Sequence, residues 1–411
     1  MTLGTDTIDS GRSAALARVA RGDLCAGCGG CAALAPGAVQ MDVSPEGYLR
    51  PVQCAPLTAA EDAHITQICP GLTQRVDAQG RRDDPLWGPY LKMHQGYATN
   101  PDLRHAGASG GSISALAAWL LDTGQVDAVL QITADPQRAV GNIATLSRTA
   151  QDVHAAAGSR YAPAAPLAVL QDLPDDVHRL AFVGKPCDAA ALRAMMALDP
   201  ALARRVTVVL SFFCAGTPSL VGADAVLAAL DTPPSQAAAF RYRGNGWPGF
   251  ATVQRQDGST AQMSYHDSWG KILSKHVQHR CKICADGTGV AADIVCADAW
   301  DSDEDGYPVF EEADGTSLIV SRTELGARLL DQAEADGALV LSDFDDTALA
   351  AIQPGQRNRR RALLARLLAL RLVGRPVPKY TGLGLLRAAR GASVRFMLRN
   401  FLGTVRRALR P

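Results

Sequence analysis

Several features that would exclude a compact cytoplasmic enzyme are missing from this 411-residue sequence. No uninterrupted apolar run reaches the length of about eighteen residues that a membrane-spanning helix requires, which argues against such a helix. Residues 1–22 contain no apolar stretch typical of a secretory signal, so we expect a cytoplasmic protein. No G-x-G-x-x-G fingerprint leads from a strand into a helix, so a standard Rossmann site for NAD is not supported.

Acidic residues are absent from the C-terminal part of the chain. Residues 357–411 hold fifteen of the 41 Lys/Arg and none of the 41 Asp/Glu, which leaves 26 basic against 41 acidic residues elsewhere. We predict that residues 351–411 form a tail of basic helices. Two roles stay open: a surface that docks on the inner face of a membrane or on an acidic protein partner, and a basic cap folded against the acidic body. Nucleic-acid binding is not indicated, because aromatic interleaving and a known reading motif are missing.

Alternating strands and helices fill the middle of the chain, from about residue 86 to residue 350. The expected strands are Val126–Ile132, Leu180–Val183 and Val206–Phe213, and the expected helices are Ser112–Asp122, a segment ending near Met196, and Pro218–Leu230. The strand Val206–Phe213 is apolar almost throughout, as expected of a strand covered on both faces. This alternation predicts an α/β domain.

Ten cysteines are the most informative count in the sequence. In a reducing cytoplasm, clustered cysteines indicate metal ligands or catalytic groups rather than disulfides. Cys25, Cys28 and Cys31 form a C-x2-C-x2-C run, the ferredoxin-type spacing that lets three thiolates face one iron–sulfur core. The glycines between them permit backbone conformations that point N–H groups at the sulfurs. The run therefore predicts a 4Fe–4S cluster.

The fourth ligand of this cluster must come from elsewhere, because Ala35 stands where the fourth ferredoxin-type cysteine would be. We favour Cys69, which Pro70 follows, and Cys54 remains a rival. A structural zinc site with the same four ligands is the alternative, although zinc ribbons usually pair two C-x2-C knuckles. Residues 1–85 bury little core without such a cofactor, so we interpret them as a small module organised by its cofactor.

A second group of cysteines follows the predicted core strands. Cys281 and Cys284 form a C-x2-C pair, and Cys187 and Cys214 come at the ends of two strands. Because strand ends of a parallel sheet meet at one edge, these four thiols can close a second four-thiolate cage. A redox-active dithiol and inert buried thiols are the alternatives. Cys296 is a possible substitute ligand.

At these residues the sequence resembles the beta-subunit family of coenzyme F-420 hydrogenases and dehydrogenases, which also takes in reductases similar to hydroxymethyl chlorophyll reductase. The matching segments cover about residues 20–305 in family order. They are CAGCGGC at 25–31, Trp87-Gly88-Pro89, Ala108-Ser109-Gly110-Gly111, Gly158-Ser159-Arg160-Tyr161, Val183-Gly184-Lys185-Pro186-Cys187, Phe213-Cys214, YRGNGWPG at 242–249, Arg280-Cys281-Lys282-Ile283-Cys284, Ala292-Asp293-Ile294 and Asp298-Ala299-Trp300.

The resemblance implies a ferredoxin-like iron–sulfur module over residues 1–85 and an FAD-binding α/β domain over residues 86–350. It also implies one or two 4Fe–4S clusters in electron-transfer range of the flavin. It strengthens the prediction of a second cluster. Ala35 departs from the ferredoxin pattern, and Cys296 stands where the family often has glycine. The resemblance does not require coenzyme F-420 as the partner, since many relatives are stand-alone reductases and some are associated with polysaccharide biosynthesis.

The expected flavin site combines small residues before a helix with a few basic and aromatic residues. Backbone N–H groups at the start of the helix Ser112–Asp122 would stabilise a pyrophosphate, and Lys185 would place a positive charge near the flavin ring. Trp247 would stack on the ring or pack in the core. The expected cofactor-binding residues are Ser109, Gly110, Gly111, Ser112, Gly184, Lys185, Arg243, Asn245 and Trp247. The expected catalytic residues are Lys185, His266 and His279, with a structural role as the alternative for each histidine.

Taken together, the sequence predicts an iron–sulfur flavoprotein oxidoreductase. Electrons would come from a ferredoxin-like or deazaflavin donor, and the flavin would reduce a small organic substrate. Two other classes stay open. One is a non-catalytic electron-transfer subunit of a larger hydrogenase or dehydrogenase, and the other is a zinc-organised accessory protein of polysaccharide biosynthesis.

Overall fold

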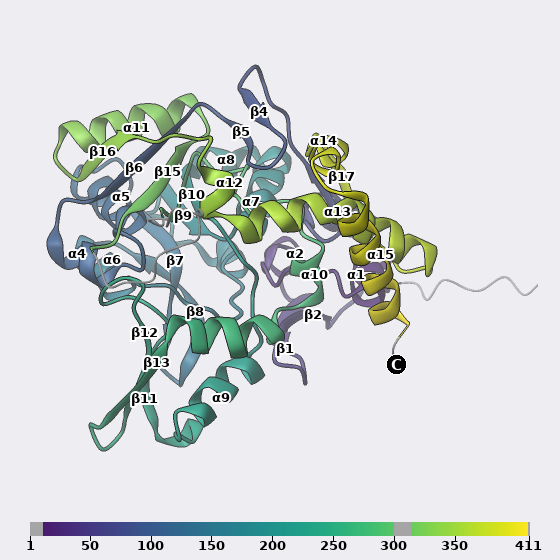
Figure 1. Ribbon diagram of the computed structural model, residues 1–411, viewed down its shortest axis with the longest axis horizontal. Helices are drawn as coiled ribbons and strands as arrows, with labels where there is room; N and C mark the ends of the chain where they lie inside the picture. Colours follow the sequence, from purple (N-terminus) through teal and green to yellow (C-terminus); the bar gives the residue numbers. More distant parts are fainter. Residues whose placement is uncertain (1–10, 300–313, 410–411) are drawn as a thin grey trace, which may run out of the picture.

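The computed structural model describes residues 11–299 and 314–409. Within these residues a mixed eight-stranded sheet forms the centre (Figure 1). Its strands, in spatial order, are β16 (Leu339–Asp343), β6 (Lys92–Ala98), β15 (Ser317–Ser321), β14 (Ile294–Asp298), β10 (Val206–Phe212), β9 (Leu180–Gly184), β7 (Ala128–Asp135) and β8 (Arg138–Ser147). The four strands β14, β10, β9 and β7 are parallel to one another, and antiparallel strands extend the sheet on both sides. The predicted α/β fold is confirmed at this level.

Helices cover both faces of the sheet. Helices α5 (Ser112–Asp122) and α11 (Glu324–Ala335) pack on one face, and α7 (Pro186–Leu198) and α12 (Leu349–Ile352) pack on the other. Successive residues of β9 alternate between the two apolar cores, because side chains of a strand point to opposite faces in turn. A strand buried on both faces must be apolar throughout, which explains the continuous apolar runs of β9 and β10.

The boundaries agree closely with the sequence pattern. Helix α5 has the predicted bounds, and α9 (Leu220–Ala229) starts two residues later than expected. Strand β7 is also shifted, since Asp127 does not join it and instead accepts hydrogen bonds from the backbone N–H groups of His178 and Arg179. Trp300, part of one matching segment, lies outside the described residues.

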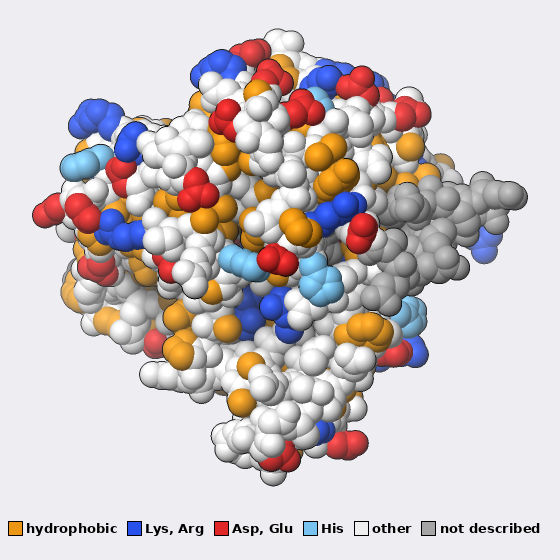
Figure 2. Space-filling model, turned by 90° about the vertical axis from the view of Figure 1, so that its left-hand side faces the viewer, with side chains coloured by type: hydrophobic (Ala, Val, Ile, Leu, Met, Phe, Trp, Pro, Cys, Tyr) orange, Lys and Arg blue, Asp and Glu red, His pale blue; other side chains and the backbone are white. Residues whose placement is uncertain are grey.

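A smaller lobe hangs from one edge of the sheet. It consists of α9, the three-stranded sheet β11 (Ala237–Arg241), β12 (Phe250–Arg255) and β13 (Thr260–Ser264), and the π-helix η3 (His266–Ile272). Its core contains Phe240 and Tyr242, whose rings meet edge to face with centroids 4.6 Å apart. On the side of the molecule in Figure 2, acidic and basic side chains are intermixed, and basic side chains lie recessed near the middle.

The N-terminal module contains three helices and a two-stranded hairpin. Its elements are α1 (Ala14–Gly22), α2 (Gly30–Leu34), β1 (Val39–Val43), β2 (Leu49–Gln53), α3 (Ala59–Ile68) and β3 (Thr73–Arg75). A ferredoxin-like fold for this module stays a prediction. The remaining short elements are β4 (Arg82–Asp84), β5 (Gly88–Tyr90), α4 (Pro101–Ala106), α6 (Ala150–Ala155), η1 (Ala168–Asp172), α8 (Pro200–Arg205), η2 (Pro234–Gln236), η4 (Leu273–His276) and α10 (His279–Lys282).

The basic tail folds back onto the N-terminal module (Figure 1). It consists of α13 (Pro354–Leu372), β17 (Lys379–Thr381), α14 (Leu385–Arg390) and α15 (Val394–Ala408). Strand β17 pairs in parallel with β3, and Leu363 and Leu367 of α13 share an apolar core with Leu24 and Ile65. Helix α13 thus acts as a cap on the body, whereas α15 lies outside it. None of the described helices is both long and apolar enough to cross a bilayer.

Candidate functional site

Four cysteines of the N-terminal module line one small, largely apolar cavity, together with Ile65, Ile68 and Pro70. We call them the first cysteine group: Cys25, Cys28, Cys31 and Cys69. Cys31 lies in α2, and Cys69 caps the C-terminus of α3, so the packing of these two helices sets the group. Cys54, the rival for the fourth position, is exposed and is not among the residues lining the cavity.

Backbone N–H groups point at the sulfur atoms of the first cysteine group. The N–H of Gly27 donates to Cys25 Sγ at 3.3 Å, and N–H groups of Gly30, Ala32 and Gly71 approach the other three sulfurs. Burial raises the pKa of all four thiols, and that of Cys69 rises to about 11. Thiols enclosed by apolar walls and N–H donors fit an iron–sulfur cluster, whose bridging and ligand sulfurs accept such hydrogen bonds.

One glycine of this loop cannot be replaced without moving the backbone. Gly29 has a φ of +85°, and a Cβ there would come within 2.8 Å of the backbone nitrogen of Ala168. Only glycine adopts that conformation freely. The C-x2-C-x2-C run therefore depends on Gly29 to turn its thiols toward one cavity.

A second cysteine group gathers at the carboxyl ends of the parallel strands. Cys187 lies in the first turn of α7 after β9, Cys214 follows β10, and Cys281 and Cys284 come from α10 and the residues after it. Burial raises the pKa of the Cys187 thiol, and the charges of Cys214 and Cys281 raise it further. The charge of Cys284 acts likewise on Cys214. The four residues thus lie within electrostatic reach of one another at this edge of the sheet, and a shared cluster stays a prediction.

Cys296 has a different environment from the second cysteine group. It lies within β14, is 5% exposed, contacts the apolar core beneath α5 and also lines the large cavity described below. Burial alone raises the pKa of its thiol, with no contribution from the other cysteines.

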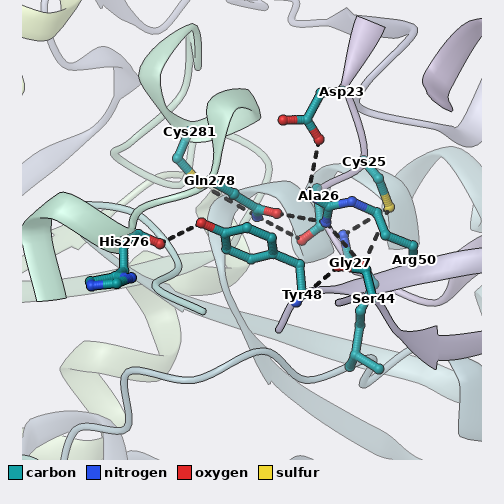
Figure 3. A network of polar contacts seen from close by, with 11 residues as sticks. Asp23, Cys25, Ala26, Gly27, Ser44, Tyr48, Arg50, His276, Gln278 and Cys281 are labelled. Atoms are coloured by element: carbon teal, nitrogen blue, oxygen red, sulfur yellow. Dashed lines mark hydrogen bonds and ion pairs between the residues drawn. The ribbon is translucent and has the colours of Figure 1, made fainter. Parts of the chain in front are cut away.

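A polar network joins the two cysteine groups (Figure 3). The buried side chain of Gln278 donates to Cys281 Sγ at 3.6 Å and to the carbonyl oxygen of Ala26 at 3.4 Å, next to Cys25. Arg50 holds Gln278 in place through a hydrogen bond of 2.9 Å to its amide oxygen. A single side chain therefore spans the space between the loops that carry the two groups.

Arg280 is a buried cation between the same two groups. Its side chain is 2% exposed, and its guanidinium donates to the carbonyl oxygen of Pro70 at 2.7 Å. Burial raises the pKa of Cys25 and Cys69, and the charge of Arg280 lowers it. Conversely, burial lowers the pKa of Arg280, whereas the charges of Tyr380 and of the cysteines of the second group raise it. This guanidinium balances negative charge on both sides.

A buried ion pair lies on another side of this space. Lys185 Nζ contacts the Asp188 carboxylate at 2.7 Å, and Asp188 is 1% exposed. After burial, the charge of Asp188 is the largest factor raising the pKa of Cys28 in one group and of Cys187 in the other. Lys185 compensates the carboxylate and at the same time faces the large pocket described next.

A cavity of about 340 Å³ opens between the sheet edge and the smaller lobe. This volume is within the range of small-molecule and cofactor sites. The N-terminus of α5 lies in its wall, where Gly111 offers no side-chain cap. Ser112 Oγ is buried there without a hydrogen-bond partner among the described residues. Unsatisfied donors at a helix N-terminus fit a pyrophosphate group, so the residues present suit FAD.

Most of the predicted flavin residues line this cavity. They are Ser109, Gly111, Ser112, Gly184, Lys185 and Arg243. Gly110, Asn245 and Trp247 are not among the residues that line the cavity. Asn245 is exposed in a turn with a φ of +57°, and Trp247 is buried elsewhere at 5% exposure.

The two predicted catalytic histidines also lie away from the cavity. His266 is exposed on the outer side of η3. His279 starts α10, and burial lowers its pKa. The segment around His266 does reach the cavity, but through Tyr265 and Trp269. A helix turns neighbouring residues to different sides, which explains why Tyr265 and Trp269 line the cavity and His266 does not.

Several wall residues are not among those expected from the sequence to bind the cofactor, although Tyr161 and Asp298 lie in the matching segments. Tyr161 packs against Trp269 with ring centroids 4.8 Å apart, and Asp298 pairs with Arg243 at 2.8 Å. Gln353 and Gln356 come from the start of the basic tail. Their role follows from the tail folding back, which composition alone does not reveal.

The tail also fixes the backbone of the second cysteine group. Arg359 and Gln356 of α13 donate to the carbonyl oxygen of Cys214 at 2.6 and 3.0 Å. Cys214 itself lines the large cavity. Thus the second cysteine group reaches the cavity through one of its own thiols.

Among residues 11–299 and 314–409, no three or more His, Cys, Asp or Glu side chains are close enough to hold a single metal ion. A 4Fe–4S cluster is much larger than one ion, so its four thiolates need not be so close.

A mixed α/β sheet with cysteines and a large cavity at the carboxyl ends of its parallel strands has the architecture in which α/β proteins form ligand sites. Comparison with known proteins identifies the family. Residues 93–171 match the N-terminal part, and residues 177–347 the C-terminal part, of the coenzyme F420 hydrogenase/dehydrogenase beta subunit. The chain belongs to this family. The second cysteine group lies inside the matched residues, and the first lies before them.

Relatives and a solved structure agree with this assignment. The chain is 24% identical to one subunit of the F(420)H(2) dehydrogenase of Methanosarcina mazei, over 77% of this chain and 84% of that protein. It is 26% identical to the beta subunit of F420-dependent formate dehydrogenase 1 of Methanococcus maripaludis, over 60% of each. A chain of the F420-reducing [NiFe] hydrogenase complex from Methanosarcina barkeri has a similar fold. The TM-score is 0.52 at 19% identity, covering 69% of this chain and 96% of that one.

Proposed function

We propose that this chain is an iron–sulfur flavoprotein oxidoreductase of the cytoplasm. Two 4Fe–4S clusters and FAD would supply one- and two-electron chemistry between a ferredoxin-like or deazaflavin donor and a small organic substrate. The observation that carries the proposal is the position of Cys214, which belongs to the second cysteine group and also lines the large cavity. Family membership and the names of the relatives support a redox role.

The proposed ligands follow from the two groups. The first cluster would be held by Cys25, Cys28, Cys31 and Cys69, and the second by Cys187, Cys214, Cys281 and Cys284. Gln278 and Arg280 link the two sets of ligands and hold them at a fixed separation. Cys296 is not a proposed ligand, because it lies within β14 and the other cysteines do not contribute to the pKa of its thiol.

The proposed flavin site uses the α5 N-terminus for phosphate and charged residues for the ring system. Ser112 Oγ and the first N–H groups of α5 would bind the pyrophosphate. Lys185 would stabilise negative charge on a reduced flavin. Asp188, which holds the Lys185 ammonium at 2.7 Å, is a positioning residue.

A proton donor for the substrate is better sought among the tyrosines than among the histidines. Tyr265 lines the cavity, whereas His266 and His279 do not. Burial raises the pKa of Tyr265 well above its usual value, so its phenol stays protonated at neutral pH. We propose Tyr265 as the group that gives a proton to substrate bound in this cavity.

A second candidate function is that of an electron-transfer subunit that has no activity alone. The relatives in the comparisons carry the names of subunits of larger enzymes, which favours this alternative. Co-purification with a larger redox partner, together with cofactor content but no turnover by the isolated chain, would distinguish it from a stand-alone reductase. No observation on the described residues favours a zinc-organised accessory protein.

The direct test is cofactor analysis of protein purified without oxygen. We expect about eight irons, about eight acid-labile sulfides and one FAD per chain, with negligible zinc. Reduced ferredoxin and a reduced deazaflavin are then offered in turn, and bleaching of the flavin band is followed. Stoichiometric zinc with little iron would contradict the proposal.

A further inference from the structure

Helix α15 presents one face to the protein and leaves the other face uncovered. Its inner face is held by Thr404, which is 5% exposed, and by Asn400, whose side-chain oxygen accepts a hydrogen bond of 2.9 Å from Arg366 of α13. Arg366 also donates to the carbonyl oxygen of Lys282. The helix is therefore anchored, and its outer face has a fixed direction.

The outer face of α15 is apolar along its length. Val394, Leu398, Leu402 and Leu409, which follows the last turn, are 84, 55, 55 and 68% exposed. The first three are four residues apart, so they lie above one another on one face of the helix. Of the thirteen large apolar side chains exposed in the described part of the chain, seven lie within residues 354–409. Such a concentration marks a contact surface.

Arginines border the apolar stripe. Arg395, Arg399 and Arg406 are exposed and follow the stripe residues at helical spacing, on one side of them. Residues 357–411 contain fifteen Lys/Arg and no carboxylate that could neutralise them. A leucine stripe beside a row of arginines is the pattern of helices that lie in a membrane interface.

The charge distribution selects among the possible occupants of this face. A second copy of the chain would bring an equally basic surface against it, and like charges repel. A partner protein would need to be both apolar and acidic over the length of the helix. An anionic bilayer supplies both properties, because acyl chains accept leucines and lipid phosphates attract arginines.

We propose that α15 binds the surface of an anionic membrane, with Val394, Leu398 and Leu402 inserted among the lipids and Arg395, Arg399 and Arg406 at the phosphate groups. The rest of the protein stays outside the bilayer. This inference goes beyond the proposed redox function and does not depend on it, since the surface involves none of the residues of the cavity or the cysteine groups.

The test is co-sedimentation of the full chain with vesicles of phosphatidylcholine alone or mixed with phosphatidylglycerol. We expect binding to the anionic vesicles and little binding to the neutral ones. The double variant Leu398→Glu/Leu402→Glu should lower the partition coefficient by roughly tenfold or more. Replacing Arg395, Arg399 and Arg406 by Gln should lower it by roughly fivefold per charge and reduce its salt dependence.

A matched control removes exposed apolar residues from the body instead. Ile143 and Phe250 are 40 and 44% exposed on β8 and β12, and Ile143→Glu/Phe250→Glu should bind vesicles as the wild type does. Circular dichroism verifies that each variant is folded. The proposal is overturned if the wild type ignores anionic vesicles. It is equally overturned if the α15 variants bind anionic vesicles as strongly as the wild type. A wild-type dimer that the α15 variants convert to monomers, with no change in vesicle binding, would overturn it too.

Discussion

The two cysteine groups differ in how the chain assembles them. The first comes mainly from one loop of seven residues, completed by Cys69, and lies in an apolar cavity with N–H donors around its sulfurs. The second comes from two strand ends and a separate C-x2-C pair, and charged side chains surround it. The first group is enclosed, whereas the second reaches the large cavity through Cys214.

We expect this difference to give the two cysteine groups different roles in electron transfer. Apolar surroundings and N–H donors tune a cluster through dielectric and hydrogen bonding, whereas nearby charges tune it through electrostatics. The second cysteine group adjoins the cavity, so we expect it to exchange electrons with the flavin, and the first to exchange them with the donor. The predictions that follow separate the two groups.

The largest effect should come from removing the second group. The variant Cys281→Ser/Cys284→Ser should lose about four irons per chain and stop electron transfer between donor and flavin, yet keep FAD, because neither residue lines the cavity. Iron analysis and flavin absorbance measure this. The matched control is Cys296→Ser, which should retain full iron content. Iron loss in the control and not in the double variant would reverse the assignment.

A smaller effect is expected at the flavin site. Gly111 has a φ of +68°, and a Cβ there would come within 2.4 Å of the carbonyl oxygen of Leu103. Gly111→Ala should therefore displace the α5 N-terminus and weaken FAD binding by roughly tenfold or more, measured by fluorescence titration. Gly124 has a φ of +64° with no atom within 4 Å of its Cβ position, so Gly124→Ala carries only the backbone cost. Equal FAD affinity in the two variants would remove α5 from the flavin site.

The smallest effect concerns the cation between the groups. Arg280→Gln removes one positive charge beside two sets of thiolates, so adding an electron becomes harder. Both cluster potentials should fall, on the order of 50 mV, in an anaerobic redox titration followed by electron paramagnetic resonance. Arg280→Lys keeps the charge and should restore most of the shift. A change in the reduction potential of only one cluster would contradict the placement of Arg280 between the two clusters.

Much of the fold could be predicted from the sequence, because parallel strands buried on both faces are recognisable as continuous apolar runs. The continuous apolar run at β10 and the helix at α5 appear at their predicted positions, since burial on both faces leaves little freedom in residue type. The pairing of β3 with β17 was not readable, because it joins residues about 300 positions apart through backbone hydrogen bonds that need no particular side chains.

The residues of the candidate site could likewise be predicted from the sequence only in part. The spacing of Cys25, Cys28 and Cys31 encodes a shared cavity locally, so it could be predicted from the sequence. Gln278 and Arg280 could not be singled out, since a buried glutamine or arginine looks like any other until the loops meet. The prediction that His266 and His279 are catalytic went beyond the sequence signal for a related reason. Sequence shows that His266 is near a cavity-lining segment but not the side to which it points.

One pair of variants tests the central claim most directly. Cys69→Ser and Cys54→Ser remove neighbouring cysteines of the same module, one lining the first cavity and one exposed. The iron content of the two anaerobically purified variants is to be measured against the wild type. The account predicts loss of about four irons in Cys69→Ser and none in Cys54→Ser. Unchanged iron in Cys69→Ser, or zinc in its place in the wild type, would contradict it.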